Sequence, residues 1–207
     1  ALARGAASAA GRGPAAGDAT RRRGSVTQEE EFTRGEADRY FRRNREQLEA
    51  LYRGAREDPV LAALDECAPD AGAVLEVGAA NGWRLERLRR ARRGGPCAGI
   101  DPSREAVADG RSRFPAIELT MGTADALPYQ GRSFDTVIFG FCLYLCDRSV
   151  LFRIAAEADR VLVDGGRVLV HDFLPERPCR NPYAHAPGVY SYKLDYVEDG
   201  TERSRML

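Results

Sequence analysis

The central part of the chain alternates short apolar runs with longer segments that are rich in charged residues. The apolar runs have the length of buried strands: AVLEVG at 73–78, CAGID at 97–101, AIELTMG at 116–122, FDTVIFG at 134–140 and GRVLVHDF at 166–173. The segments between them predict helices over 82–93, 103–112 and 147–162, and Ser103 and Asp147 are expected N-caps. This alternation predicts an α/β fold: a doubly wound, Rossmann-like, mainly parallel sheet with helices on both faces.

Before the first strand, the apolar residues follow a helical period. Thr27 and Glu30 have the spacing of a capping box, and Asp58 with Pro59 marks the start of a second helix, DPVLAALDECA. Large apolar side chains recur between these two signals, at Phe32, Tyr40, Phe41, Leu48 and Leu51. We therefore predict an N-terminal helical cap over 27–70, followed by a core over 71–175.

The first 26 residues consist largely of alanine, glycine and arginine. Such a segment buries too little apolar surface to offset its ordering entropy, so we expect it to be disordered. An arginine-rich, acid-poor leader also fits an organelle transit peptide, although hydroxyl residues and an amphipathic pattern are weak here. We expect the rest of the chain to form one core, because 207 residues are too few for two comfortable domains.

Charge and cysteine content narrow the function classes. The 31 basic and 31 acidic residues cancel, so we expect neither nucleic acid nor a membrane as a partner. Because no apolar run approaches the ~20 residues of a membrane span, we predict a soluble, cytoplasmic protein. The five cysteines are odd in number and lack the spacing of a zinc site, which predicts reduced, buried thiols and no metal.

The segment VLEVGAANGWRLERL places small residues between the first predicted strand and the helix that follows it. Gly78 and Gly82 permit unusual backbone angles, while Ala79 and Ala80 keep bulk off the loop, so a ligand can approach the main chain. Asp101 ends the second strand, where a carboxylate can accept hydrogen bonds from both hydroxyls of a ribose. The alternative is that the small residues only let the helix pack closely on the sheet.

At this point the sequence resembles the class I S-adenosylmethionine-dependent methyltransferases. The resemblance covers about residues 72–173 and consists of five motifs in order: VLEVGAANG, GIDPS, GTADALPY, FDTVIFGFCLYLCD and ADRVLVDGGRVLVHDF. It implies S-adenosyl-L-methionine as cofactor and a methyl transfer as the reaction.

The resemblance also assigns roles to individual residues. It implies that Glu76 orients the loop and the amino-acid end of the cofactor, and that Asp101 binds the ribose. The other implied cofactor contacts are the turn residues Gly78, Ala79, Ala80 and Gly82, the adenine neighbours Pro102, Ser103, Asp125 and Ala126, and Phe141 and Cys142 beside the methionine part. Asp125 has an alternative role as a turn residue that caps local backbone.

Two features depart from the family pattern. The middle glycine of the turn is Ala80, which tightens the loop around a ligand. The family's sheet usually ends in an antiparallel pair of strands, but here only the segment 176–207 remains, which we predict to form a substrate-side loop and a partial hairpin. Within it, YSYKLDYV reads as a strand, and Asp199–Gly200 as a turn with seven residues left to return. We expect these C-terminal strands to be shortened or missing, which would leave an unpaired sheet edge.

Methyl transfer mainly requires that both reactants be bound and aligned. A hydroxyl acceptor would benefit from a general base, for which His171 beside Asp172 is the candidate; the alternative is a strand-end histidine that hydrogen-bonds a loop. Tyr40 and Phe41 either close the pocket or pack in the core. Because the chain lacks the [DN]-P-P-[YF] arrangement, the resemblance favours a small-molecule, sugar or lipid-linked acceptor over DNA or glutamine.

Two other functions fit the same fold. An NAD-dependent oxidoreductase would require G-x-G-x-x-G after the first strand, and GAANGW fails that spacing. A non-catalytic methyltransferase-like protein would bind the cofactor or a partner without forming product. The sequence leaves the methylated atom and the oligomeric state open.

Overall fold

The computed structural model describes residues 27–67, 72–91 and 95–196, which include a five-stranded sheet with the order β3-β2-β1-β4-β5. All neighbouring strands in this sheet are parallel. The strands are β1 (Val74–Val77), β2 (Cys97–Asp101), β3 (Glu118–Met121), β4 (Phe134–Gly140) and β5 (Leu162–His171). The predicted doubly wound sheet is confirmed, and its strand order reverses between β1 and β4, where such sheets bind ligands.

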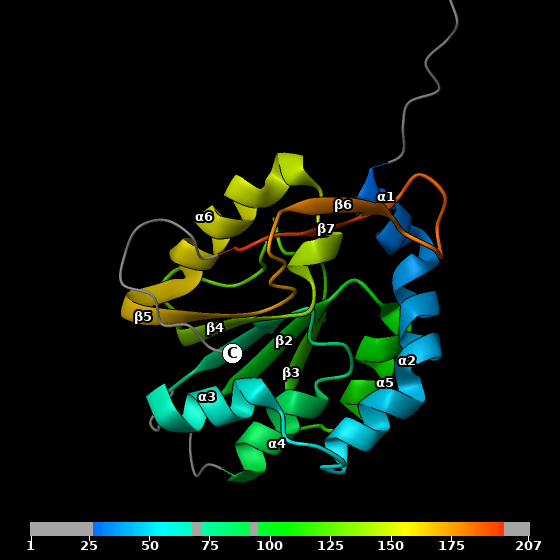
Figure 1. Ribbon diagram of the computed structural model, residues 1–207. Coiled ribbons are helices and arrows are strands. Elements are labelled where there is room, and N and C mark those ends of the chain that lie inside the picture. Colours follow the sequence, from blue (N-terminus) through cyan, green and yellow to red (C-terminus); the bar gives the residue numbers. More distant parts are fainter. Residues whose placement is uncertain (1–26, 68–71, 92–94, 197–207) are drawn as a thin grey trace, which may run out of the picture.

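Helices cover both faces of this sheet, as the alternation of strands and helices predicted (Figure 1). One face packs against α3 (Pro59–Cys67), α4 (Trp83–Ala91) and α5 (Arg104–Arg113). The other face packs against α6 (Leu151–Val161). Successive side chains of a strand point to opposite faces, so Val74 belongs to the first core and Leu75 to the second.

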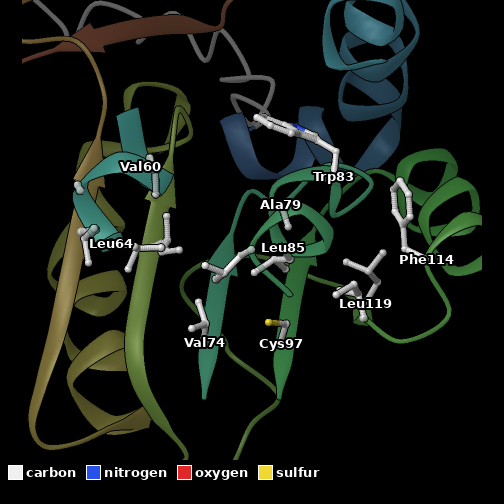
Figure 2. Close-up of a cluster of buried hydrophobic side chains, with 14 of the residues drawn as sticks. Val60, Leu64, Val74, Ala79, Trp83, Leu85, Cys97, Phe114 and Leu119 are labelled. Atoms are coloured by element: carbon white, nitrogen blue, oxygen red, sulfur yellow. The ribbon is translucent and has the colours of Figure 1, made fainter. Parts of the chain in front are cut away.

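The first core joins three helices to the strands (Figure 2). Val60 and Leu64 of α3 lie on the same face of the sheet as Trp83 and Leu85 of α4 (Figure 2). Leu64 and Leu85 are completely buried. Burying a leucine side chain stabilises the fold by about 1.5–3 kcal/mol, so this layer fixes where α4 starts and thereby the loop between β1 and α4.

The N-terminal cap consists of α1 (Gln28–Glu31), the π-helical turn η1 (Phe32–Glu36) and α2 (Ala37–Tyr52). The predicted capping box is confirmed, because the Thr27 hydroxyl accepts from the Glu30 N–H and the Glu30 carboxylate accepts from the Thr27 N–H, both at 3.1 Å. Gly35 has a φ of 149° and kinks the chain between α1 and α2. Beyond the kink, α2 runs alongside α4 and α5 (Figure 1).

The C-terminal part forms a separate antiparallel ribbon of β6 (Cys179–Pro182) and β7 (Tyr190–Lys193) (Figure 1). The strand expected over YSYKLDYV therefore ends at Lys193 and pairs with the segment before it, Cys179 opposite Lys193. The turn expected at Asp199–Gly200 lies outside the described residues. Among the described strands, β5 is the outer strand of the main sheet beside β4.

Several expectations about local structure are corrected. Asp147 is not the N-cap of the helix after β4: its carboxylate accepts from the backbone N–H of Gln28 at 2.9 Å, and two short 3-10 turns, η2 (Leu143–Leu145) and η3 (Arg148–Val150), precede α6. Ser103 does cap α5, accepting from Ala106 N at 3.0 Å. Strand β5 begins at Leu162, four residues earlier than expected and at the position where the preceding helix was expected to end.

The cysteines differ in part from the expectation of uniform burial. Cys67 and Cys179 are exposed, Cys97 is buried, and Cys142 and Cys146 are half-buried. Within the described ranges, no three His, Cys, Asp or Glu residues are arranged to hold a metal ion. No helix in these ranges has the length and apolar character needed to cross a membrane. The predicted disorder of residues 1–26 falls outside the described part of the chain.

Candidate functional site

A cavity of about 410 Å³ lies where β1, β2 and β4 end. Its floor consists of the loop after β1, the end of β2 and the segment after β4, and helix α2 contributes the opposite wall. The predicted cofactor residues that line it are Glu76, Gly78, Ala79, Ala80, Asp101, Pro102, Asp125, Phe141 and Cys142. Gly82, Ser103 and Ala126 are not among its lining residues.

The loop after β1 owes its shape to left-handed backbone angles. The φ angles of Gly78, Ala80 and Gly82 are 74°, 50° and 75°, a region that glycine enters without strain. A Cβ atom on Gly78 would lie 2.6 Å from the Cβ of Cys142, so the loop and the end of β4 meet at a distance that only glycine permits. Gly82 acts at the start of α4, where its N–H donates to Ala79 O at 2.8 Å.

Asp101 connects the loop to the end of β2. Its carboxylate accepts from the Ala80 N–H and from the Ser103 N–H, each at 2.8 Å. Burial raises the pKa of Asp101 to about 6, and the two backbone hydrogen bonds limit the rise. Each carboxylate oxygen retains a further lone pair, so Asp101 can still accept hydrogen bonds from a ligand.

Ser103 has a structural position rather than a place in the cavity wall. Besides capping α5, its hydroxyl donates to the Asp38 carboxylate of α2 at 2.7 Å. Asp38 also accepts from the Glu105 N–H at 3.0 Å. Ser103 therefore joins α5 to α2, the helix that closes the cavity.

Three charged side chains form a buried cluster at the end of β1. The guanidinium of Arg84 donates to Glu76 Oε1 through Nη1 and to Asp58 Oδ2 through Nε, the latter at 3.0 Å. The exposed fractions are 1% for Glu76, 7% for Arg84 and 3% for Asp58. Glu76 Oε2 has no hydrogen-bond partner in the part of the chain described, although it is buried. Burial raises the pKa of Glu76, while the positive charge of Arg84 opposes the rise.

A second group of acids lies where α1 approaches the segment after β3. Asp125 is 8% exposed, and its carboxylate lies 3.4 Å from Nη1 of Arg153. Glu29 of α1 lines the same cavity, and its pKa is raised by burial and by the charge of Asp125. Ala126 stands in the turn beside them, where its N–H donates to Thr123 O at 3.5 Å.

The remaining wall is aromatic. It comprises Phe32, Tyr40, Phe41, Phe141, Tyr144 and Phe173. Burial raises the pKa of both Tyr40 and Tyr144, and the two hydroxyls influence each other's pKa. The rings of Tyr144 and Phe173 meet edge to face with centroids 5.1 Å apart. Helix α2 therefore closes the cavity with Tyr40 and Phe41. From the sequence alone, these two residues could either close the pocket or pack in the core.

The candidate general base has a different position. Neither His171 nor Asp172 is among the residues that line the cavity. The ring of His171 lies against Phe141, which does line it, with centroids 4.5 Å apart. Asp172 accepts from the Tyr144 N–H at 3.1 Å and from the Phe173 N–H at 2.8 Å. Burial lowers the pKa of His171, and the charge of Arg84 lowers it further.

Sequence reasoning missed several cavity residues. The cavity is also lined by Glu29, Phe32, Arg84 and Tyr144. Asp58 is not among the lining residues but accepts a hydrogen bond from Arg84. The sequence did contain one signal for Arg84, which is a charged residue in the first turn of a helix that packs on the sheet. A charge buried there is usually paired with an opposite charge, so a partner for Arg84 could have been expected. The partner Asp58 is 26 residues away in the chain, and no local pattern connects the two.

Comparison with known proteins finds similarity to methyltransferases. Residues 74–166 match the family model described as a methyltransferase domain. The chain is similar to the demethylmenaquinone methyltransferase of Tropheryma whipplei, 30% identical over 148 residues that cover 62% of this chain and 60% of that protein. It is also similar to the ubiquinone/menaquinone biosynthesis C-methyltransferase of Desulfotalea psychrophila, 30% identical over 115 residues, 55% of this chain and 45% of that protein. The chain thus spans about half to three-fifths of the length of these relatives.

A solved structure resembles the fold. The SAM-bound amino pentose methyltransferase from Micromonospora echinaspora, involved in calicheamicin biosynthesis, has a TM-score of 0.50 and 22% sequence identity, over 64% of this chain and 61% of that one. At this identity the likeness concerns the fold alone.

Proposed function

We propose that this protein transfers a methyl group from S-adenosylmethionine to a small-molecule acceptor in the cavity described above. The match of residues 74–166 to a methyltransferase domain supports this proposal. The observation that carries the proposal is the connection between Ala80 and Asp101 at 2.8 Å. It holds a loop of small residues that lines the cavity and an acid with spare acceptor capacity at one sheet edge, an arrangement that suits a nucleoside ligand.

The residues around the cavity fit this cofactor. Glu76 presents an unpartnered, buried oxygen that can accept from an ammonium group, and Asp101 can accept from ribose hydroxyls. Asp125 provides an acceptor for an adenine amino group. When bound, S-adenosylmethionine supplies a methyl group on a sulfonium, from which oxygen, nitrogen, sulfur or carbon nucleophiles displace it. The protein's contribution is then to hold both reactants in line and to exclude water.

The aromatic wall supports a flat, uncharged acceptor. Phe141, Tyr144 and Phe173 can pack against a ring, and the hydroxyls of Tyr40 and Tyr144 can hydrogen-bond an oxygen on it. Two relatives are named as methyltransferases of quinone biosynthesis, which favours a hydroquinone-like ring within the wider class of small, sugar or lipid-linked acceptors. Tyr144→Phe and Tyr40→Phe should leave cofactor affinity unchanged and weaken binding of such an acceptor.

A general base remains a separate proposal. The lowered pKa of His171 favours the neutral imidazole, which can accept a proton, but the ring of Phe141 lies beside it at the cavity wall. If His171 serves as base with Asp172, His171→Ala should lower turnover without changing the affinity for S-adenosylhomocysteine. If alignment alone drives the reaction, turnover should be retained.

Calorimetric titration with S-adenosylmethionine, S-adenosylhomocysteine and NADH tests the proposal, together with Asp101→Ala. We expect micromolar binding of the two sulfur nucleosides, which Asp101→Ala weakens. Binding of NADH alone would favour the oxidoreductase alternative. Binding of S-adenosylmethionine without methyl transfer to any acceptor in a panel of hydroquinones, sugars and small phenols would favour the non-catalytic alternative.

A further inference from the structure

We propose that Asp58 and Arg84 are positioning residues for the cofactor: they fix Glu76 and leave their buried cluster with one net negative charge that binds the cofactor's ammonium group. This inference rests on the proposed function, and it adds to the site Asp58, the residue that directly precedes helix α3. Asp58 lies outside the matched domain of residues 74–166.

The geometry holds Arg84 between two fixed carboxylates. Asp58 is anchored at the start of α3, where its Oδ1 accepts from the backbone N–H groups of Val60 at 3.0 Å and Leu61 at 3.1 Å. The same carboxylate accepts from Arg84 Nε, and Arg84 Nη1 donates to Glu76 Oε1. Glu76 is thereby held on one oxygen only, while its second oxygen has no partner in the described part of the chain.

The surrounding structure leaves these side chains little room to rearrange. A Cβ atom on Gly140 would lie 2.6 Å from Arg84 Nη1 and 2.9 Å from Glu76 Oε1, so the cluster packs directly on the backbone at the end of β4. On its other side, the Arg84 guanidinium lies 4.7 Å from the centre of the Trp83 ring. Both Glu76 and Arg84 line the cavity.

The count of charges explains why two acids are needed. A pair of Arg84 and Glu76 alone would be neutral and would attract an ammonium group only through a dipole. Asp58 compensates the guanidinium, so that the ionised cluster carries one negative charge. In a buried site such a charge is weakly screened and acts strongly on a cation. Glu76 also depends on Arg84, because a buried carboxyl without a cationic neighbour tends to become protonated.

The decisive variant is Asp58→Asn, tested with two ligands that differ only at the amino-acid end. S-adenosylhomocysteine carries the ammonium group, whereas 5′-methylthioadenosine retains adenine, ribose and sulfur but lacks the amino-acid end. Asparagine remains a good N-cap, so α3 should persist. We expect Asp58→Asn to weaken S-adenosylhomocysteine about tenfold or more and methylthioadenosine by less than about twofold. Asp164→Asn is the control, since that side chain is 81% exposed and pairs with Arg132.

A double-mutant cycle tests whether Asp58 acts through Glu76. Glu76→Gln should produce the same selective loss, and Asp58→Asn added to Glu76→Gln should weaken S-adenosylhomocysteine little further. Equal weakening of both ligands by Asp58→Asn, no weakening of either, or additive losses in the cycle would overturn the positioning role. If the wild-type protein binds neither nucleoside, the proposed function itself fails; if it binds both and Asp58→Asn changes nothing, only this inference fails.

Discussion

The backbone N–H of Ala80 donates a hydrogen bond of 2.8 Å to the carboxylate of Asp101, which joins the loop after β1 to the end of β2 across 21 positions of the chain. The second oxygen of Asp101 accepts from the Ser103 N–H, also at 2.8 Å. One carboxylate therefore positions the backbone of the loop after β1 and that of the segment after β2. The protonation state of Asp101 should accordingly affect both binding and stability.

Affinity for S-adenosylhomocysteine should rise with pH as Asp101 ionises. Burial raises the pKa of Asp101 from 3.8 to about 6, so at pH 5 only about a tenth of the sites are ionised and binding should be about tenfold weaker than at pH 7. Asp101→Asn should bind weakly and lose this pH dependence. Calorimetric titrations from pH 5 to pH 8 measure this change in affinity. If Asp101→Asn showed the same pH dependence as the wild-type protein, the pH dependence could not be assigned to Asp101.

The same raised pKa has a consequence for folding. Because the folded-state pKa lies above the unfolded value, the contribution of Asp101 to stability is fully present below pH 3.8 and is lost as the pH rises through about 6. The difference in free energy of unfolding between wild type and Asp101→Asn should therefore change between pH 4 and pH 7. Urea titrations at the two pH values measure that difference, in which the other titrating groups largely cancel.

Gly78→Ala should abolish cofactor binding, whereas Gly165→Ala should not. Both glycines have similar φ angles, 74° and 75°, so both substitutions strain the backbone by about 1 kcal/mol. Only at Gly78 would the added Cβ meet another atom, Cys142 Cβ at 2.6 Å, because Gly165 has nothing within 4 Å. Thermal melting and titration with S-adenosylhomocysteine separate the two effects. Equal loss of binding in both variants would show that strain, and not the contact with Cys142, governs the loop.

Gln28→Ala should release helix α1 from the rest of the molecule. Gln28 is 4% exposed; its side chain donates to Leu145 O at 2.7 Å and accepts from the Tyr190 N–H at 2.8 Å. Leaving such groups unpaired costs about 1–3 kcal/mol each where they stay buried. Hydrogen exchange should increase in α1 and at Tyr190, with the core strands protected as before. Gln130→Ala, at an exposed position, is the control and should leave exchange unchanged.

Glu36→Gln should destabilise the fold at neutral pH and have a smaller effect in acid. Glu36 is fully buried and accepts from Arg39 at 2.7 Å and from Arg43 at 2.6 Å. Burial alone would raise the pKa of Glu36, but the hydrogen bonds from Arg43 and Arg39 outweigh it and lower the pKa.

Since the folded-state pKa of Glu36 is lowered, its stabilisation is present above the ordinary value of 4.5 and lost as the pH falls below it. Glu36→Gln should therefore cost about 1–3 kcal/mol at pH 7 and less near pH 4. Glu46→Gln, at an exposed position of α2, should have little effect at either pH. A constant cost for Glu36→Gln across this range would mean that packing, not charge, is lost.

Whether the prediction for an element was correct depends on how far apart in the sequence the interacting residues lie. The strand signals at 97–101 and 134–140 agree with β2 and β4, and the caps at Thr27 and Ser103 form as expected. These features depend on the spacing of hydrophobic residues or on hydrogen bonds between residues three positions apart, and both can be recognised within a short stretch of sequence. Asp147, like Ser103, is a residue type that commonly caps helices. Its carboxylate instead accepts from the backbone N–H of Gln28, 119 positions away.

The candidate site likewise contains features that local sequence determines and contacts that only packing determines. By itself, the sequence determined the doubly wound sheet, the small-residue loop at Gly78 and the acid at Asp101, because strand alternation, backbone freedom and residue type are local properties. Only the tertiary structure decided that Asp58 meets Arg84, that Tyr40 meets Tyr144, and that β7 pairs with β6. Those contacts join segments whose encounter is set by how the helices pack and how the chain closes on itself, and neither is encoded in any short stretch of residues.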